Sequence, residues 1–202
     1  FGDILVDEDL PSTPPRVEVV KTGRNYWVFE YHELAEALSE DRTRNELIAG
    51  IVKREIESGR KLLVFTKRCS HRDLIYEQLK QTLSSSGDGI HVIKASGNAK
   101  EKLETQELLA TLRSGERDFS VLVSTHSLLS VGFDCPSLDT LLLAGDLRSD
   151  VLAEQSAGRL TRLFEGKKDP KIIDLMDSHG ILYNQFKARL AFYKSKDWQV
   201  TL

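Results

Sequence analysis

The stretch Ser149–Arg162 reads SDVLAEQSAGRLTR and begins with two residue types that cap helices well. If the stretch is a helix, each residue turns the chain by about 100°, and four residues that could contact a ligand then fall within a sector of about 100° on one face. These residues are Gln155, Gly158, Arg159 and Arg162. The opposite face is apolar and consists of Ala153, Ala157, Leu160 and Phe164. The stretch therefore predicts a helix that docks on a core and presents two arginines together.

Two arginines on one helix face suit a phosphate or another planar anion, because each guanidinium offers a rigid fork of donors and keeps its charge. Gly158 on the same face leaves room for a ligand or backbone to approach closely. Taken alone, the helix is more simply interpreted as a solvated basic face. The rest of the chain decides between the two interpretations.

Composition limits the classes of protein to which the chain belongs. Its 202 residues are 40% hydrophobic, which is enough for one domain with a substantial core and an appendage. The formal net charge of −3 excludes a generally basic nucleic-acid coat, although a local basic groove remains open. Cys69 and Cys135 have no nearby cysteine or histidine at metal spacing, so we expect neither a disulfide framework nor a metal site.

No apolar run reaches membrane length and no secretory signal is present, so we expect an intracellular protein, in the cytoplasm or the nucleoid or nucleus, without a membrane partner. The chain begins at Phe1 rather than Met, and we expect it to be a piece of a longer protein.

Residues 1–40 are interpreted as an acidic, proline-containing connector with short strands from a preceding domain, and residues 41–202 as the main domain. Phe1–Pro15 has the composition of a linker, and Arg16–Val20 and Tyr26–Tyr31 have the pattern of short strands. The run Ile4–Glu8 (ILVDE) mimics a strand that holds magnesium in ATPases. It receives little weight, because no Gly-x-x-x-x-Gly-Lys-Ser/Thr loop occurs in the chain.

From residue 41 onward, short apolar runs alternate with helical patterns. The predicted strands are Lys61–Thr66, Ile90–Lys94, Phe119–Ser124, Leu138–Ala144 and Lys171–Met176. The predicted helices cover about Asp41–Ser58, His71–Leu83, a segment from Asn98 to Gly115, the stretch quoted above, and about Ser178–Lys194. Asn98 and Glu101 have the spacing of a capping box. This alternation predicts an α/β fold with a mainly parallel sheet covered by helices on both faces.

Functional loops of such folds lie at the carboxyl ends of the strands, and we expect four of them to meet at one sheet edge. The polar or glycine-bearing loops are Lys67-Arg68, Ala95–Gly97, Thr125–Cys135 and Gly145–Asp150. In the third loop, Gly132 permits a close approach and Asp134 can accept bonds from a pair of sugar hydroxyls. A simple turn remains the alternative for that loop taken singly.

The order and spacing of these features resemble the C-terminal RecA-like domain of superfamily-2 helicases and translocases, over about Asp41 to Asp177. A strand ending in Phe65-Thr66 resembles motif IV, Thr125 to Asp134 resembles motif V, and Gln155-x-x-Gly158-Arg159-x-x-Arg162 resembles motif VI. The resemblance implies a three-layer RecA-like sandwich. It also implies ATP and Mg²⁺ as cofactors, held mainly by an N-terminal RecA-like domain of the same protein, and nucleic acid as partner.

The resemblance also implies roles for individual residues. Arg159 and Arg162 match the two arginines that reach the γ-phosphate of ATP on the partner domain. The remaining nucleotide-binding positions are Gln155, Gly158, Gly132 and Asp134. Nucleic-acid contacts fall on Lys67, Arg68, Ser96, Gly97, Thr125 and His126. Histidine in a loop is as often internally satisfied, so for His126 both interpretations stay open.

Motif VI here starts with Gln155 instead of the His-Arg typical of DEAD-box RNA helicases. This difference favours the DNA repair, phage and restriction-type branches, and DNA over RNA as substrate. The function expected is the second motor domain of a helicase or translocase, which hydrolyses no ATP by itself. A non-catalytic RecA-like module that binds strands or proteins is the alternative, and an unrelated nucleotide-binding α/β enzyme is a more distant one.

Other noticeable residues have simpler explanations. Tyr26, Trp27 and Tyr31 could stack on bases, yet aromatic residues in a strand more often pack in a core. Cys135 is expected to be a small packed residue, because no base adjoins it. The apolar residues of the last helix are expected in the core, namely Phe186, Leu190 and Phe192.

Overall fold

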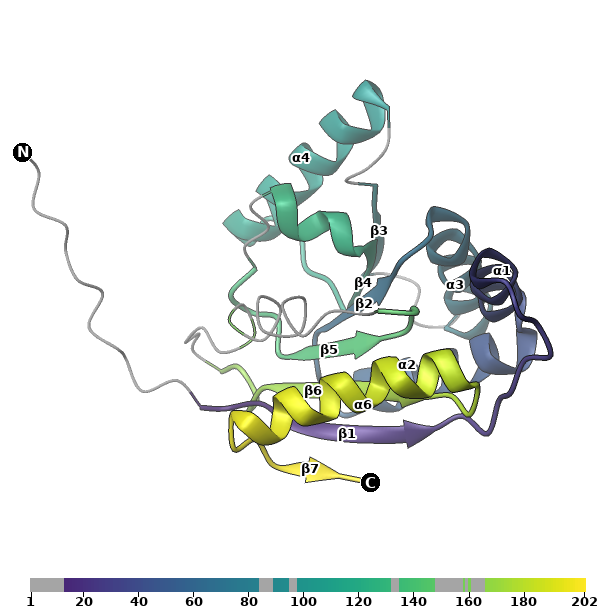
Figure 1. The fold of residues 1–202 in the computed structure, drawn as a ribbon. Coiled ribbons are helices and arrows are strands. Elements are labelled where there is room, and N and C mark those ends of the chain that lie inside the picture. Colours follow the sequence, from purple (N-terminus) through teal and green to yellow (C-terminus); the bar gives the residue numbers. More distant parts are fainter. Residues whose placement is uncertain are drawn as a thin grey trace, which may run out of the picture.

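The computed structural model describes residues 13–83, 89–94, 98–131, 135–147, 158, 160 and 166–202. Within these residues seven strands form a single sheet in which every neighbouring pair is parallel, in the order β3-β4-β2-β5-β6-β1-β7 (Figure 1). The strands are β1 (Arg16–Lys21), β2 (Leu62–Thr66), β3 (Ile90–Ile93), β4 (Val121–Thr125), β5 (Thr140–Leu143), β6 (Lys171–Met176) and β7 (Val200–Thr201). The helices are α1 (Tyr31–Glu40), α2 (Arg42–Glu57), α3 (Cys69–Thr82), α4 (Ala99–Ser114) and α6 (Gly180–Ser195), with a 3₁₀ helix η1 (His126–Val131).

Alternate residues of the central strands feed two separate hydrophobic cores. In β2, Leu62 and Val64 join a core with residues of α2 and α3, whereas Leu63 and Phe65 join a core with residues of α4 and α6. Every residue of β2 is buried, as expected for a parallel strand covered on both faces. The result is the predicted three-layer arrangement of helices, sheet and helices.

The strands and helices expected between residues 41 and 202 are confirmed wherever the structure describes them, with ends that differ by a few residues. The capping box of α4 is present: the Asn98 side chain accepts from the Glu101 amide at 3.0 Å, and the Glu101 carboxylate accepts from the Asn98 amide at 3.0 Å. Gly115 ends the same helix in the left-handed region, at φ 77°. Phe186 and Cys135 are buried, and Leu190 and Phe192 pack against the same core, as predicted.

The strand predicted for Tyr26–Tyr31 is wrong. Residues 26–30 belong to neither a strand nor a helix, and α1 begins at Tyr31. Tyr26 and Val28 pack against a small core shared by α1 and α6, whereas Trp27 and Phe29 are 91% and 95% exposed. The alternation that resembled a strand therefore comes from a segment that lies on helices, and the core position considered for Trp27 is also wrong.

The segment before residue 41 contributes directly to the sheet and to the helical layers. β1 lies between β6 and β7 and pairs with β6 along all six of its residues. Helix α1 contacts α2 and α3. The short strand β7 was not predicted, because two residues are too few to show an alternating pattern.

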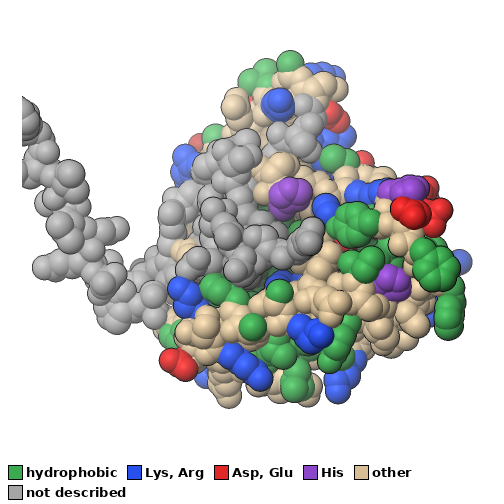
Figure 2. Space-filling model, viewed as in Figure 1, with side chains coloured by type: hydrophobic (Ala, Val, Ile, Leu, Met, Phe, Trp, Pro, Cys, Tyr) green, Lys and Arg blue, Asp and Glu red, His purple; other side chains and the backbone are tan. Residues whose placement is uncertain are grey.

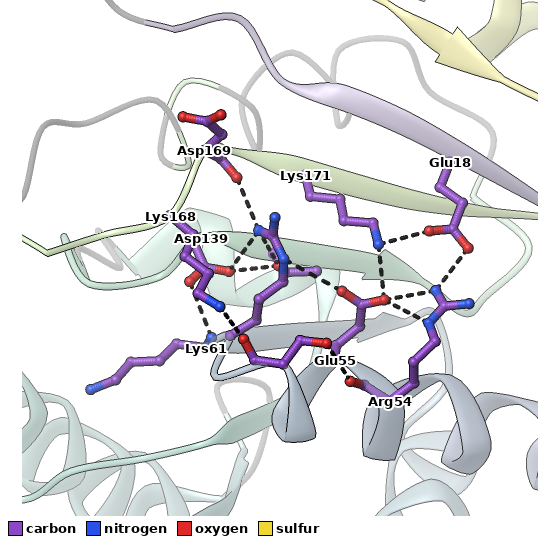
Figure 3. Close-up of polar contacts among 11 residues, drawn as sticks. Glu18, Arg54, Glu55, Lys61, Asp139, Lys168, Asp169 and Lys171 are labelled. Carbon is purple, nitrogen blue, oxygen red and sulfur yellow. Dashed lines mark hydrogen bonds and ion pairs between the residues drawn. The ribbon is translucent and has the colours of Figure 1, made fainter.

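An ion network fastens α2 to the sheet near the amino ends of β1, β5 and β6 (Figure 3). The buried carboxylate of Glu55 accepts from Arg54 and Lys171, each at 2.8 Å, and Lys171 also contacts Glu18 at 2.7 Å. Arg60 donates to the Asp169 carbonyl at 2.9 Å and contacts Asp139 at 3.3 Å. These contacts connect α2, β1 and β6 with the segments that precede β2 and β5.

Helices α2 and α3 are joined by a buried hydrogen bond between His71 and Asn45. Nε2 of His71 lies 3.0 Å from Oδ1 of Asn45, which accepts, and the imidazole is 1% exposed. Burial, together with the nearby charge of Arg44, lowers the pKa of His71 to about 3. The imidazole of the folded protein is therefore uncharged near pH 7.

We predict that His71 makes the protein lose stability in mild acid. The unfolded chain gains a proton at His71 below about pH 6.5, whereas the folded chain does not until about pH 3, so the free energy of unfolding falls between these values. At pH 5 the expected loss from this residue is about 2 kcal/mol relative to pH 7.5. Urea unfolding at both pH values measures it. His71→Gln is the control and should show a smaller difference; an equal difference would refute the prediction.

Candidate functional site

Because the sheet is parallel, the polar loops after its strands emerge at one edge. β4, β2 and β5 are adjacent, and their ends are level: Thr66 pairs with Thr125, and Phe65 pairs with Leu143. The edge therefore brings together the predicted residues Lys67, Arg68, Thr125 and His126 with the segment 144–147 that follows β5. Gly158 is also described, whereas the remaining predicted site residues lie outside the described residues: Ser96, Gly97, Gly132, Asp134, Gln155, Arg159 and Arg162.

The backbone after β5 passes very close to the backbone after β2. The amides of Ala144 and Gly145 donate to the Phe65 carbonyl at 2.9 and 3.1 Å. A Cβ built on Gly145 would lie 2.7 Å from the Lys67 amide nitrogen and 3.2 Å from backbone atoms of Thr66. Only a glycine allows this approach, so Gly145 fixes how the chain leaves β5.

Lys67 is held by two partners from other elements. Its ammonium lies 3.3 Å from Oδ2 of Asp146 and 4.6 Å from the centre of the Tyr31 ring, and it also contacts the Tyr31 hydroxyl. The Tyr31 hydroxyl donates to the buried Asp146 carboxylate. Burial disfavours the Lys67 charge, but Tyr31 and Asp146 outweigh it and raise the pKa of Lys67. Lys67 is thus a permanent cation with about a third of its side chain exposed.

The other residues predicted to contact nucleic acid differ in how far their side chains are exposed to solvent. Arg68 donates to the His32 carbonyl at 3.0 Å, which directs its guanidinium toward the start of α1. Thr125 is buried, and its hydroxyl lies 2.6 Å from that of Ser127. His126 is exposed at the first position of η1. Of these residues, His126 presents its side chain to solvent, whereas the Thr125 hydroxyl faces a neighbour within the loop.

Two buried arginines that were not among the predicted site residues hold the segment after β5. Arg44 of α2 pairs with Asp177 and donates to the Ala144 carbonyl at 2.6 Å. Arg189 of α6 pairs with Asp174 of β6 and donates to the Leu147 carbonyl. Asp174 provided a signal, because a carboxylate within the apolar run KIIDLM must have a partner. No comparable sign in the sequence indicates that the two arginines are buried, since arginine on a helix is usually exposed.

Gly158 and Leu160 test the orientation predicted for the helix Ser149–Arg162. Both are helical; Leu160 is 1% exposed and belongs to the core that α4 and α6 share, whereas Gly158 is exposed. At these two positions the predicted faces are confirmed. A Cβ built on Gly158 meets no heavy atom of the described residues within 4 Å, so packing against those residues does not require a glycine.

The described part of the face in Figure 2 carries no single basic field. On the face shown in Figure 2, Lys and Arg side chains are scattered among hydrophobic, acidic and uncharged ones. This distribution agrees with the formal net charge of −3. No helix among the described residues has the length and apolar character that crossing a membrane requires.

The residues that the structure describes do not form a complete site for ATP and Mg²⁺. The sequence contains no phosphate-binding glycine-lysine loop. Among the residues that the structure describes, no three His, Cys, Asp or Glu side chains converge as metal ligands. The arginines predicted at 159 and 162 suit the anionic side of a phosphate group and not the cation.

Comparison with known proteins identifies the family. Residues 43–163, more than half of the chain, match the model of the helicase conserved C-terminal domain. The chain belongs to this helicase C-terminal domain family. It is 27% identical over 154 residues to the probable helicase D10 of Escherichia phage T5, a match that covers 76% of the chain and 32% of D10.

Two further similarities place the helicase C-terminal domain in context. The transcript termination protein A18 of fowlpox virus is 32% identical over 155 residues, covering 75% of the chain and 30% of A18. The crystal structure of T4 UvsW superposes with a TM-score of 0.71 at 15% identity, covering 92% of the chain and 40% of UvsW, which shows the shared RecA-like fold. The chain spans about a third of the length of the curated relatives it matches.

We predict that Gly145→Ala destabilises this domain by about 1–3 kcal/mol, because the added methyl group forces apart the backbones after β2 and β5. Urea unfolding of the chain measures the effect. Gly50→Ala in α2 is the matched control, since no heavy atom of the described residues lies within 4 Å of a Cβ at that position. Equal stability of the Gly145→Ala variant and the wild type would show that the two backbones separate easily.

Proposed function

We propose that this chain is the second motor domain of an ATP-dependent helicase or translocase that acts on nucleic acid, with DNA preferred. The observation that supports this best is the gathering of the loops after β2, β4 and β5 at one edge, in a chain that belongs to the helicase C-terminal domain family. The preference for DNA rests on Gln155 at the start of the motif, where DEAD-box RNA helicases have His-Arg.

In this proposal Arg159 and Arg162 point to the γ-phosphate of an ATP that a first RecA-like domain of the same protein holds. Gln155, Gly158, Gly132 and Asp134 line the same cleft. The nucleic-acid backbone lies along Lys67, Arg68, Ser96, Gly97, Thr125 and His126. The exposure of Gly158 beside the buried Leu160 supports a helix whose polar face is directed away from this domain's core.

The physical role of the arginines is charge stabilisation. Phosphoryl transfer spreads negative charge over the γ-phosphoryl oxygens, and an arginine finger accelerates it by about 10³–10⁵-fold, or roughly 4–7 kcal/mol. When bound, Mg²⁺ would neutralise charge on the β- and γ-phosphates. Because the fingers and the nucleotide belong to different domains, hydrolysis requires the domains to close, and this requirement links ATP turnover to motion along a strand.

A non-catalytic module for binding strands or proteins is the alternative. Both proposals agree with the lack of a phosphate-binding glycine-lysine loop in the 202 residues, because the motor proposal assigns that loop to the first domain. The alternative requires Arg159 and Arg162 to be dispensable for turnover, so the same variants distinguish the two proposals.

We predict that Arg159→Ala and Arg162→Ala, each in the full-length protein, reduce nucleic-acid-stimulated ATPase activity by at least about 10³-fold. Binding to single strands should change little, because these arginines face the nucleotide. Steady-state ATPase assays with single-stranded DNA and with RNA, together with strand-binding titrations, measure both effects. Arg113→Ala is the matched control, since Arg113 is an exposed arginine near the end of α4.

Near wild-type turnover in both arginine variants would refute the motor proposal and favour the non-catalytic alternative. ATP hydrolysis by the purified 202-residue chain would contradict the division of the site between two domains. Stronger stimulation by RNA than by DNA would overturn the substrate preference and leave the motor role intact.

We predict that Gly158→Ala stabilises the domain slightly and still impairs the ATPase. Alanine is favoured over glycine within helices by about 0.8–1 kcal/mol, and the described residues leave room for its methyl group. When the two motor domains close, the alanine methyl group would meet the nucleotide or the first domain. Gly50→Ala, a helical glycine in the same kind of open position, should stabilise equally without lowering turnover. Equal turnover in both variants would remove Gly158 from the nucleotide site.

A further inference from the structure

The backbone from Ala144 to Leu147 is held from both faces of the sheet. Arg44 reaches it from α2 on one face, and Arg189 reaches it from α6 on the other. The segment leads directly into the stretch that contains the predicted arginine fingers. Both arginines are almost completely buried, with 1% and 4% of their surfaces exposed.

The Arg44 guanidinium uses its two sides for different partners. Nε and Nη2 each lie 3.1 Å from a carboxylate oxygen of Asp177, and Nη1 lies 2.6 Å from the Ala144 carbonyl oxygen. The Thr22 hydroxyl also donates to Asp177, at 2.5 Å. The position of the Ala144 carbonyl is thereby fixed relative to the end of β6.

Arg189 repeats this arrangement from the other face. Nε and Nη2 lie 2.9 and 2.7 Å from the two oxygens of Asp174, and Nη1 donates to the Leu147 carbonyl. Tyr193 adds a hydrogen bond to Asp174 at 2.9 Å. The pKa of Arg189 is raised, because the carboxylate of Asp174 outweighs the burial that opposes the charge. The charge of Arg189 is therefore permanent.

Stability alone is a poor explanation for these two pairs. Burying an ion pair costs several kcal/mol of solvation, and well-packed apolar residues often serve a fold equally well. An apolar pair, however, cannot donate to a backbone carbonyl. What the arginines add is a fixed position for two backbone carbonyls after β5. Ala144 directly follows the strand, and Leu147 lies three residues further on.

We propose that Arg44 and Arg189 are positioning residues that aim the segment after β5, so that Arg159 and Arg162 meet the nucleotide on the first domain. This inference rests on the proposed function of the chain. Neither arginine contacts substrate; each acts through the backbone that leads to the fingers. Lysine at either position keeps a charge opposite the aspartate, but it has one nitrogen where arginine has three and cannot reproduce the fork.

The experiment uses Arg44→Lys and Arg189→Lys in the full-length protein. Each should reduce kcat of the nucleic-acid-stimulated ATPase by about 10- to 100-fold, because small misplacements of catalytic groups have effects of this size. KM for ATP and strand affinity should stay within about twofold. Amide hydrogen exchange in peptides that cover residues 144–160 should accelerate. Assays run well below the unfolding temperature of each variant keep the folded fraction equal.

Arg60→Lys is the matched control. Arg60 also joins an aspartate, Asp139, and a backbone carbonyl, that of Asp169, but it does so near the amino ends of the strands (its network is drawn in Figure 3). It should leave kcat and the exchange of residues 144–160 unchanged. An equal fall of kcat in Arg60→Lys would overturn the positioning role and assign the effect to general loosening of the fold.

Combination with removal of both fingers separates this inference from the proposed function. If Arg44 and Arg189 act through the fingers, neither lysine variant should lower the residual single-turnover rate of the Arg159→Ala/Arg162→Ala double variant any further. Full additivity would overturn the inference, as would wild-type kcat in both lysine variants while Arg159→Ala is inactive. Wild-type turnover in Arg159→Ala itself would overturn the finger role and the positioning role together.

Discussion

The parallel direction of all seven described strands is the constraint on which the rest of this domain depends. Each strand must be followed by a return across a face of the sheet, so helices cover both faces and β2, β4 and β5 are buried on both. The same constraint gathers every carboxyl end at one edge. Residues that are far apart in the sequence, such as Lys67 and Asp146, meet there without any further requirement.

The layer architecture and most elements could be predicted from the sequence, because strands buried on both faces form short apolar runs and helices show their own period. Tyr26–Tyr31 is the exception. Alternation of apolar and polar residues indicates which side chains turn inward, and an irregular segment that lies on helices can show the same alternation as a strand. In the candidate site, the proximity of Lys67, Arg68, Thr125 and His126 could be predicted, because loops at the carboxyl ends of parallel strands lie on the same side of the sheet. The assignments at 132, 134, 155, 159 and 162 stay predictions, since these positions lie outside the described residues.

The buried charges could not be predicted in the same way. Hydrophobic patterns identify which face of a helix is apolar, and they treat Arg44 and Arg189 as ordinary exposed positions. Their burial follows from partners about 130 and 40 residues away on the chain, Asp177 and Leu147, which only the folded arrangement brings near. Asp174 is the exception, because a charge inside an apolar strand requires a partner wherever that partner comes from.

The two edges of the sheet use buried charge for different purposes. Near the amino ends, Glu55 is surrounded by Arg54, Arg60 and Lys171, so positive and negative groups mainly satisfy one another and bind α2 to the strands. At the carboxyl edge, Arg44 and Arg189 each keep one donor for a backbone carbonyl after pairing with an aspartate. A backbone fixed in this way from two opposing layers cannot shift without breaking a charged hydrogen bond, and leaving such a group unpaired in the interior costs more than the bond itself contributes. The carboxyl side of the sheet therefore has two backbone carbonyls, those of Ala144 and Leu147, held by charged donors from opposite layers.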